Sequence, residues 1–143
     1  PNNPDPEAFD LLLLTLRTLE SHDRPLVALI WGELKLLEIE GVMPDWLECS
    51  VDGSRLAEDP AWLSPAAGGY VSLAHAAEFS DRFQAPAEVA IGLAKTADLD
   101  LAPPRLKHDV YCLRALVPFV RHMAHAPLPA HEAAIRSLDA PTA

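Results

Sequence analysis

The stretch that decides the fold runs over residues 36–75 and reads LLEIEGVMPDWLECSVDGSRLAEDPAWLSPAAGGYVSLAH. Gly41 predicts the end of a helix, because glycine readily takes the left-handed conformation that terminates one. Pro44 follows, and proline cannot continue a helix. Two turn-rich segments come next, CSVDG at residues 49–53 and SPAAGG at residues 64–69. The stretch therefore predicts a helix end, a cysteine-bearing knuckle and a glycine turn.

The knuckle has the spacing of a metal-binding ribbon. Such a ribbon holds its ligands at the first and fourth positions of two knuckles, as in C-x-x-C. Here these positions hold Cys49, Asp52, Ser72 and His75. Cysteine and histidine are good zinc ligands and aspartate is acceptable, but serine is a poor one. We therefore expect a ribbon that has lost its metal, with residual zinc binding as the alternative.

Hydrophobic packing has to hold such a metal-free ribbon together. The side chains expected to do so are Trp46, Leu47, Trp62 and Tyr70. Residues 61–63 and 69–71 are expected to pair as a small hairpin across the SPAAGG turn. Gly68 and Gly69 are expected to supply at least one positive φ there.

Helical periodicity flanks this region on both sides. The expected helices cover residues 6–21, 24–40, 85–97, 106–126 and 130–138. Asp5 and Asp23 are suited to cap the first two. Pro118 predicts a kink in the long fourth helix. Its expected apolar face consists of Leu106, Val110, Leu113, Val117, Val120 and Ala124.

These elements predict an all-α fold. Residues 1–143 form a single helical domain, and residues 43–75 form a small irregular or two-stranded, zinc-ribbon-like insertion. A chain of 143 residues, half of them hydrophobic, suits one domain with its own core. The chain begins with Pro1 rather than Met, which indicates a fragment or a processed product.

Charge and cysteine content narrow the function. The formal net charge of −10 argues against a nucleic-acid binder, because phosphate contacts need Lys and Arg. No apolar run reaches the ~18 residues that span a bilayer. Cys49 and Cys112 lie far apart, so a disulfide is not indicated and a reducing, intracellular compartment is the simpler interpretation.

One basic helix face stands out against the acidic chain. Lys107, Arg114 and Arg121 are spaced by seven residues, and His125 lies four residues beyond Arg121. Such a face suits an acidic partner, either a phosphate backbone or an acidic peptide; the alternative is an ordinary solvated surface.

The remaining chemical groups give no sign of an enzyme. His122, His125 and His131 could chelate a metal, but a surface cluster is the simpler interpretation because no carboxylate completes the set. Cys49 and His75 could form a nucleophile–base pair, yet they are more simply the remnant of the knuckle. No phosphate loop, nucleophile elbow or H-E-x-x-H motif is present.

The knuckle frame resembles the C-terminal region of the RecO family of bacterial DNA-repair proteins. In that family a helix ending in a Gly-x-x-Pro-like turn leads into C-x-x-C-G, as Gly41–Pro44 leads here into CSVDG. A Ser-Pro-x-x-Gly-Gly turn then leads into a second C-x-x-C, as residues 64–69 lead here to Ser72 and His75. The long helix and the APLPA segment at residues 126–130 continue the match.

The resemblance implies a non-enzymatic recombination mediator in DNA repair. It implies binding of RecR and of the acidic C-terminal tail of single-strand DNA-binding protein, with Lys107, Arg114 and Arg121 as our candidate contacts. In the family a separate N-terminal OB-fold carries much of the DNA contact; this chain lacks its five-stranded pattern, so we expect only weak binding of single-stranded DNA. A bacterial cytoplasmic, nucleoid-associated location follows. The rival interpretation is a helical ligand-binding domain of a transcription factor.

Overall fold

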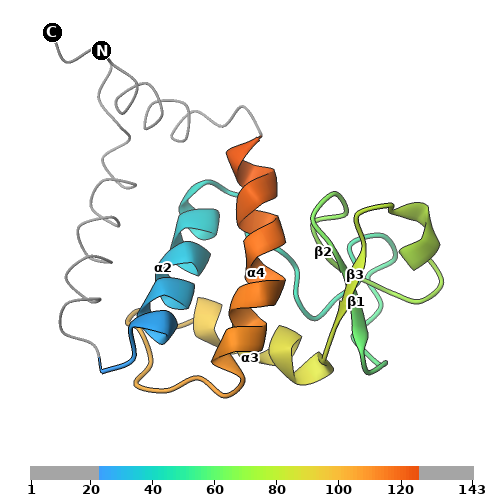
Figure 1. Ribbon diagram of the computed structural model, residues 1–143. Helices are drawn as coiled ribbons and strands as arrows, with labels where there is room; N and C mark the ends of the chain where they lie inside the picture. Colours follow the sequence, from blue (N-terminus) through green and yellow to red (C-terminus); the bar gives the residue numbers. More distant parts are fainter. Residues whose placement is uncertain (1–22, 126–143) are drawn as a thin grey trace, which may run out of the picture.

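The structure, a computed structural model, describes residues 23–125 of the 143-residue chain (Figure 1). In chain order the elements of this range are α2 (Pro25–Ile39), β1 (Ala61–Ser64), β2 (Gly69–Val71), the short 3₁₀ turn η1 (Ala76–Glu78), β3 (Phe83–Ala85), α3 (Ala87–Ala97) and α4 (Asp109–Ala124). The helices expected at residues 6–21 and 130–138, and His131, lie outside the described residues.

The prediction of an all-α fold is wrong. The strands form a three-stranded antiparallel sheet of order β2-β1-β3, so the described part of the chain is mixed α/β. The expected hairpin is present as β1 and β2, with Leu63 opposite Tyr70. The sequence analysis missed β3, which pairs with the other edge of β1 and places Phe83 opposite Leu63. The insertion therefore extends past residue 75 as far as β3.

The reason for the missed strand lies in its length. β3 has three residues, and a segment so short shows too little alternation to be told from a loop. One local signal was present: β3 directly precedes Pro86, and a residue before proline is pushed toward extended backbone.

α2 begins and ends close to the predicted positions. Pro25 stands in its first turn, although Arg24 rather than Asp23 takes the N-cap position and no side chain caps the helix. At the other end Gly41 has φ +74°, and its amide donates to Glu38 O at 3.0 Å. The Val42 amide donates to Leu37 O at 2.9 Å. This pair of bonds is the Schellman ending that glycine favours.

The three helices pack against one another and form the helical body, with the sheet on the far side of α4 from α2 (Figure 1). Two side chains of α2 fix the C-terminal end of α3. The indole of Trp31 donates to Leu99 O at 3.0 Å, and the Lys35 ammonium donates to Ala97 O at 2.8 Å. A cation at the last carbonyls of a helix is stabilising because those carbonyls lack intrahelical partners.

The core-facing side of α4 differs from the predicted one. Its buried residues are Cys112, Ala115, Leu116, Phe119 and Met123. Val110, expected in the core, is 47% exposed. The helix begins at Asp109 rather than near residue 106, because His108 takes a left-handed conformation with φ +58°. Pro118 lies inside α4, and the kink expected there stays a prediction.

Phe119 joins the helical body to the insertion. Its ring meets Trp46 edge to face at a centroid distance of 5.0 Å, and Phe83 of β3 at 6.2 Å. Edge-to-face aromatic pairs contribute roughly 0.5–1.5 kcal/mol beyond the area they bury. Trp46 and Tyr70, two of the four side chains expected to hold the ribbon, are fully buried.

The prediction of a positive φ in the glycine pair is confirmed for both residues, at +92° for Gly68 and +141° for Gly69. A Cβ on Gly69 would lie 2.2 Å from Asp45 O, which is backbone and cannot swing aside, whereas a Cβ on Gly68 would meet nothing within 4 Å.

We predict that Gly69→Ala lowers the free energy of unfolding by about 3 kcal/mol, through clash and strain together. Gly68→Ala, which adds backbone strain without a clash, is the matched control and should cost about 1–2 kcal/mol. Urea unfolding followed by tryptophan fluorescence measures both. Equal losses in the two variants would show that the approach of Asp45 to Gly69 does not constrain the fold.

Candidate functional site

The structure brings all four predicted knuckle positions together around the carboxylate of Asp52. The Ser72 hydroxyl donates to Asp52 Oδ2 at 3.1 Å, and His75 Nε2 lies 3.4 Å from the same oxygen. Ser54 donates twice to Asp52 Oδ1, from its amide at 2.9 Å and its hydroxyl at 2.6 Å. Asp52 is therefore the centre of the cluster, at one of the positions where a ribbon would hold a ligand.

The sulfur of Cys49 is fixed by the backbone. The amides of Val51 and Ser72 donate to Cys49 Sγ at 3.4 and 3.2 Å, so both knuckles close on one sulfur. The Gly53 amide donates to Cys49 O at 2.8 Å and completes the turn. Cys49 is 3% exposed.

The hydrogen bonds set the charge of Asp52. Those from Ser54, with smaller contributions from Cys49 and Ser72, hold the pKa of Asp52 well below its usual value of 3.8. The carboxylate is thus ionised throughout the neutral range. His75 also contacts Glu78, with Nδ1 2.5 Å from its carboxylate, so the imidazole lies between two acids.

A metal ion would require a different arrangement. Within residues 23–125, no three His, Cys, Asp or Glu side chains are placed as ligands for one ion. Hydrogen bonds already use both oxygens of Asp52, and zinc prefers thiolates that neutralise its charge. The residues present therefore fit a hydrogen-bonded knuckle better than a zinc site.

The second cysteine, Cys112, has a thiol of low reactivity. Cys112 is fully buried in α4, and burial, with a smaller effect from Asp109, raises the pKa of its thiol to about 11. The thiolate is the reactive form, so this thiol reacts slowly at neutral pH. Cys49 and Cys112 are both free.

The three cations expected on one helix face are separated by the structure. Arg114 and Arg121 are exposed on α4, but Lys107 precedes the helix, because α4 begins only at Asp109. The Arg114 guanidinium lies over the ring of Tyr111 at 5.7 Å, and that ring meets His108 at 6.4 Å. Arg114 is therefore linked to the segment that carries Lys107, whereas Arg121 lies two turns farther along.

Lys107 lines an open pocket of about 520 Å³ between α3 and the segment that leads into α4. Lys95 and Arg105 line it too, and all three cations are exposed. Its single acidic residue, Glu88, is paired with His108 at 2.9 Å. Apolar side chains complete the walls: Ile91, Leu99 and Leu106.

Sequence reasoning missed Lys95 and Arg105 because their neighbourhood depends on tertiary structure. A clue was available in α3, where Ile91 and Lys95 lie four residues apart and so share one exposed face. Of the expected histidine set, His122 and His125 are exposed at the end of α4, and His122 lines a separate hollow of about 270 Å³ beside Phe119.

These features define a helical body with a ribbon-like insertion whose knuckle is built without a full ligand set. The family described as "Recombination protein O C terminal" matches residues 1–116, which is more than half of the chain. The chain belongs to this family.

Individual relatives agree with the family. Two curated proteins named DNA repair protein RecO, from Desulfitobacterium hafniense strains DSM 10664 / DCB-2 and Y51, are each 38% identical over 71 residues. The match covers 50% of this chain and only 26% of each relative. No solved structure gave a significant match. None of the described helices has the length and apolar character that crossing a membrane requires.

We predict that the chain binds far less than one zinc ion per molecule, because Cys49 is the only cysteine among the four knuckle positions. Replacing the other three positions with cysteine (Asp52→Cys, Ser72→Cys, His75→Cys) should create a site that takes one zinc, since all four positions already converge. Elemental analysis after gel filtration measures both proteins. Near-stoichiometric zinc in the wild type, lost in Cys49→Ala, would refute the metal-free knuckle.

The lowered pKa of Asp52 predicts a pH-dependent stability. Because the folded pKa lies below the unfolded value of 3.8, the stabilisation is fully present above that pH and is lost as the pH falls below it. Asp52→Asn should lower the melting temperature by a few degrees at pH 7, with the difference shrinking below pH 3.8. Asp100→Asn, in an exposed loop, is the control. A difference independent of pH would contradict this assignment.

Proposed function

We propose that the chain acts as the C-terminal part of a recombination mediator in DNA repair, where it docks a protein partner and carries out no chemistry itself. Membership of the recombination protein O family and the two relatives named DNA repair protein RecO support the repair role. The observation that carries the docking role is the pocket beside α3, with three exposed cations and apolar walls.

An acidic peptide with an apolar end is the occupant that fits this pocket. The chain as a whole has a net charge of −10, so a local group of Lys95, Arg105 and Lys107 is an exception in it. The lining contains one carboxylate, Glu88, which lies 2.9 Å from His108 Nε2, so three cations stand against a single acid. Ile91 and Leu99, 37% and 40% exposed, offer apolar surface between the charges.

The backbone at one end of the pocket is also preorganised. Trp31 and Lys35 hold the carbonyls of Leu99 and Ala97 in place, so the C-terminal end of α3 is tied to α2. A rigid site loses less entropy when its ligand binds.

The partner that we propose is the acidic C-terminal tail of single-strand DNA-binding protein, as the family resemblance implies. We propose that RecR is a second partner, which binds this chain at another surface. Contact with single-stranded DNA by this chain alone should be weak and should disappear as salt rises, because few cations are available to replace counterions.

The rival role, a ligand-binding domain of a transcription factor, has less support. It requires an enclosed apolar cavity. Three pockets lined by residues 23–125 open at the surface of α3, the knuckle or α4, and the family match favours repair.

We predict that Lys107→Glu and Arg105→Glu each weaken binding of a fluorescent acidic peptide with a free apolar C-terminal residue by about tenfold or more. The reason is that charge-assisted hydrogen bonds contribute roughly 1.5–3 kcal/mol each. Arg114→Glu should have a smaller effect, since Arg114 reaches the pocket only through Tyr111 and His108. Fluorescence anisotropy measures the affinities, and melting temperatures verify the fold.

Arg82→Glu is the matched control, because it makes the same change of charge beside Trp62 on the sheet. Arg121→Glu tests the outer part of α4. If Arg82→Glu weakens binding as much as Lys107→Glu, the effect is only one of net charge. If every variant binds with wild-type affinity, the pocket is not the docking site.

A further inference from the structure

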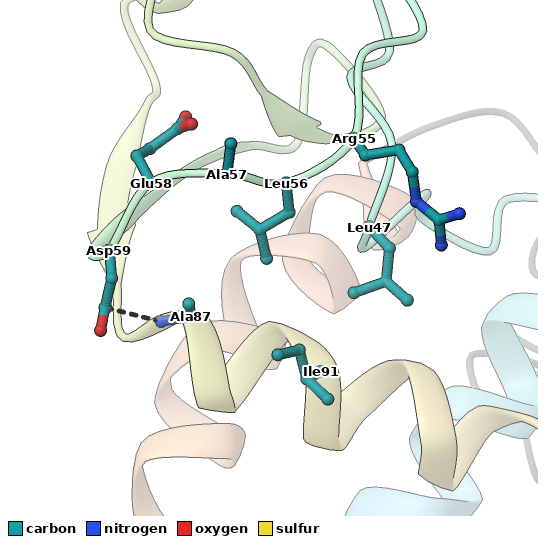
Figure 2. Close-up of a pocket in the computed structure, with 8 residues that line it drawn as sticks. All are labelled: Leu47, Arg55, Leu56, Ala57, Glu58, Asp59, Ala87 and Ile91. Carbon is teal, nitrogen blue, oxygen red and sulfur yellow. Dashed lines mark hydrogen bonds between the residues drawn. The ribbon is translucent and has the colours of Figure 1, made fainter.

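The docking pocket has a neighbour on the other side of Ile91. A second open pocket, of about 310 Å³, lies between the N-terminal part of α3 and the knuckle (Figure 2). Ile91 lines both pockets, so they adjoin along the exposed face of α3. Figure 2 shows Leu47 and Leu56 projecting from the knuckle toward α3, where Ile91 faces them.

The interior of this second pocket is apolar, because its acidic side chains are engaged elsewhere. Asp59 Oδ1 accepts the amide of Ala87 at 2.9 Å and so caps the start of α3. Glu58 accepts the Tyr70 hydroxyl at 2.6 Å, and in Figure 2 its carboxylate points away from the space beside Leu56. Arg55, exposed at the edge, is the remaining charge in the lining.

The knuckle holds the roof of this pocket in place. The Leu56 amide donates to Leu47 O at 2.7 Å, and Glu48 and Arg55 form an isolated antiparallel bridge. Leu47 and Leu56 therefore belong to hydrogen-bonded backbone rather than to a free loop, so this apolar wall is preorganised for a ligand.

We infer that the two pockets form one docking groove for an acidic peptide with two apolar side chains, an inference that rests on the proposed function. The first apolar side chain enters the pocket of Lys95, Arg105 and Lys107. The second enters the pocket under Leu47 and Leu56, where Arg55 meets an acidic residue beside it.

The geometry sets the spacing of the two apolar side chains. The α3 residues that line the two pockets centre roughly three residues apart, which is about 5 Å at 1.5 Å per residue. An extended peptide advances about 3.3 Å per residue and returns to the same face every second residue, so the two side chains should lie about two residues apart. An acidic segment with one apolar residue would fill only half of the groove.

The test compares two labelled acidic peptides of equal length and charge on the full chain. One has a single apolar residue at its C-terminus; the other has a second apolar residue two positions earlier. The second peptide should bind about tenfold more tightly to the wild type. Ala57→Trp fills the second pocket from an exposed position. It should abolish this gain and leave the affinity for the first peptide unchanged. Arg55→Glu reverses the cation of the second pocket and should weaken the binding of both peptides, because they carry equal charge.

Ala77→Trp is the control, since Ala77 is exposed on η1 and should preserve the gain. If both peptides bind the wild type equally, or if Ala57→Trp leaves the gain intact, the second pocket is refuted as a binding site and the first pocket stands. If neither peptide binds the wild type, the proposed function fails and this inference fails with it.

Discussion

The close approach of the Asp45 backbone to Gly69 is the constraint on which the rest of the insertion depends. The Asp45 amide donates to Gly68 O at 2.9 Å, and Asp45 O accepts the Tyr70 amide at 2.8 Å. These bonds attach the segment after α2 to the edge strand β2. They also place the two following residues, so that Trp46 reaches Phe119 and Leu47 lies over α3. Only glycine leaves room for that approach.

The knuckle shows how a ribbon can keep its shape with few metal ligands. A buried sulfur that accepts two amides and a carboxylate that accepts several hydrogen bonds satisfy the polar groups of both turns. These hydrogen bonds join the turn at residues 49–54 to residues 72–75, so they can replace the ion as the organiser of the turns. The same knuckle carries Leu56, and its conformation thereby shapes the groove beside α3.

The sequence predicted those parts of the structure that local rules determine. Gly41 predicted the end of α2, and the pair Gly68 and Gly69 predicted the turn between β1 and β2. The C-x-x-C-like spacing of Cys49 and Asp52, and of Ser72 and His75, predicted the knuckle. Family membership also followed from these motifs. Prediction failed where tertiary context decides. β3 is too short to show a period. The apolar residues of α4 form two adjoining stripes, and tertiary packing buries the one through Leu116 and Phe119. Lys107 was grouped with Arg114 and Arg121 because the helix was taken to start three residues early, whereas Lys95 and Arg105 approach Lys107 only through the packing of α3.

The burial of both native thiols makes this chain convenient for spectroscopy. Maleimide dyes react with thiolates, and the thiol of Cys112 forms little thiolate at neutral pH because its pKa is raised to about 11. Cys49 is shielded inside the closed knuckle. A single cysteine introduced at an exposed position would therefore carry nearly all of the label. Distances between a dye on the chain and a dye on a peptide could then be measured with the natural core left intact.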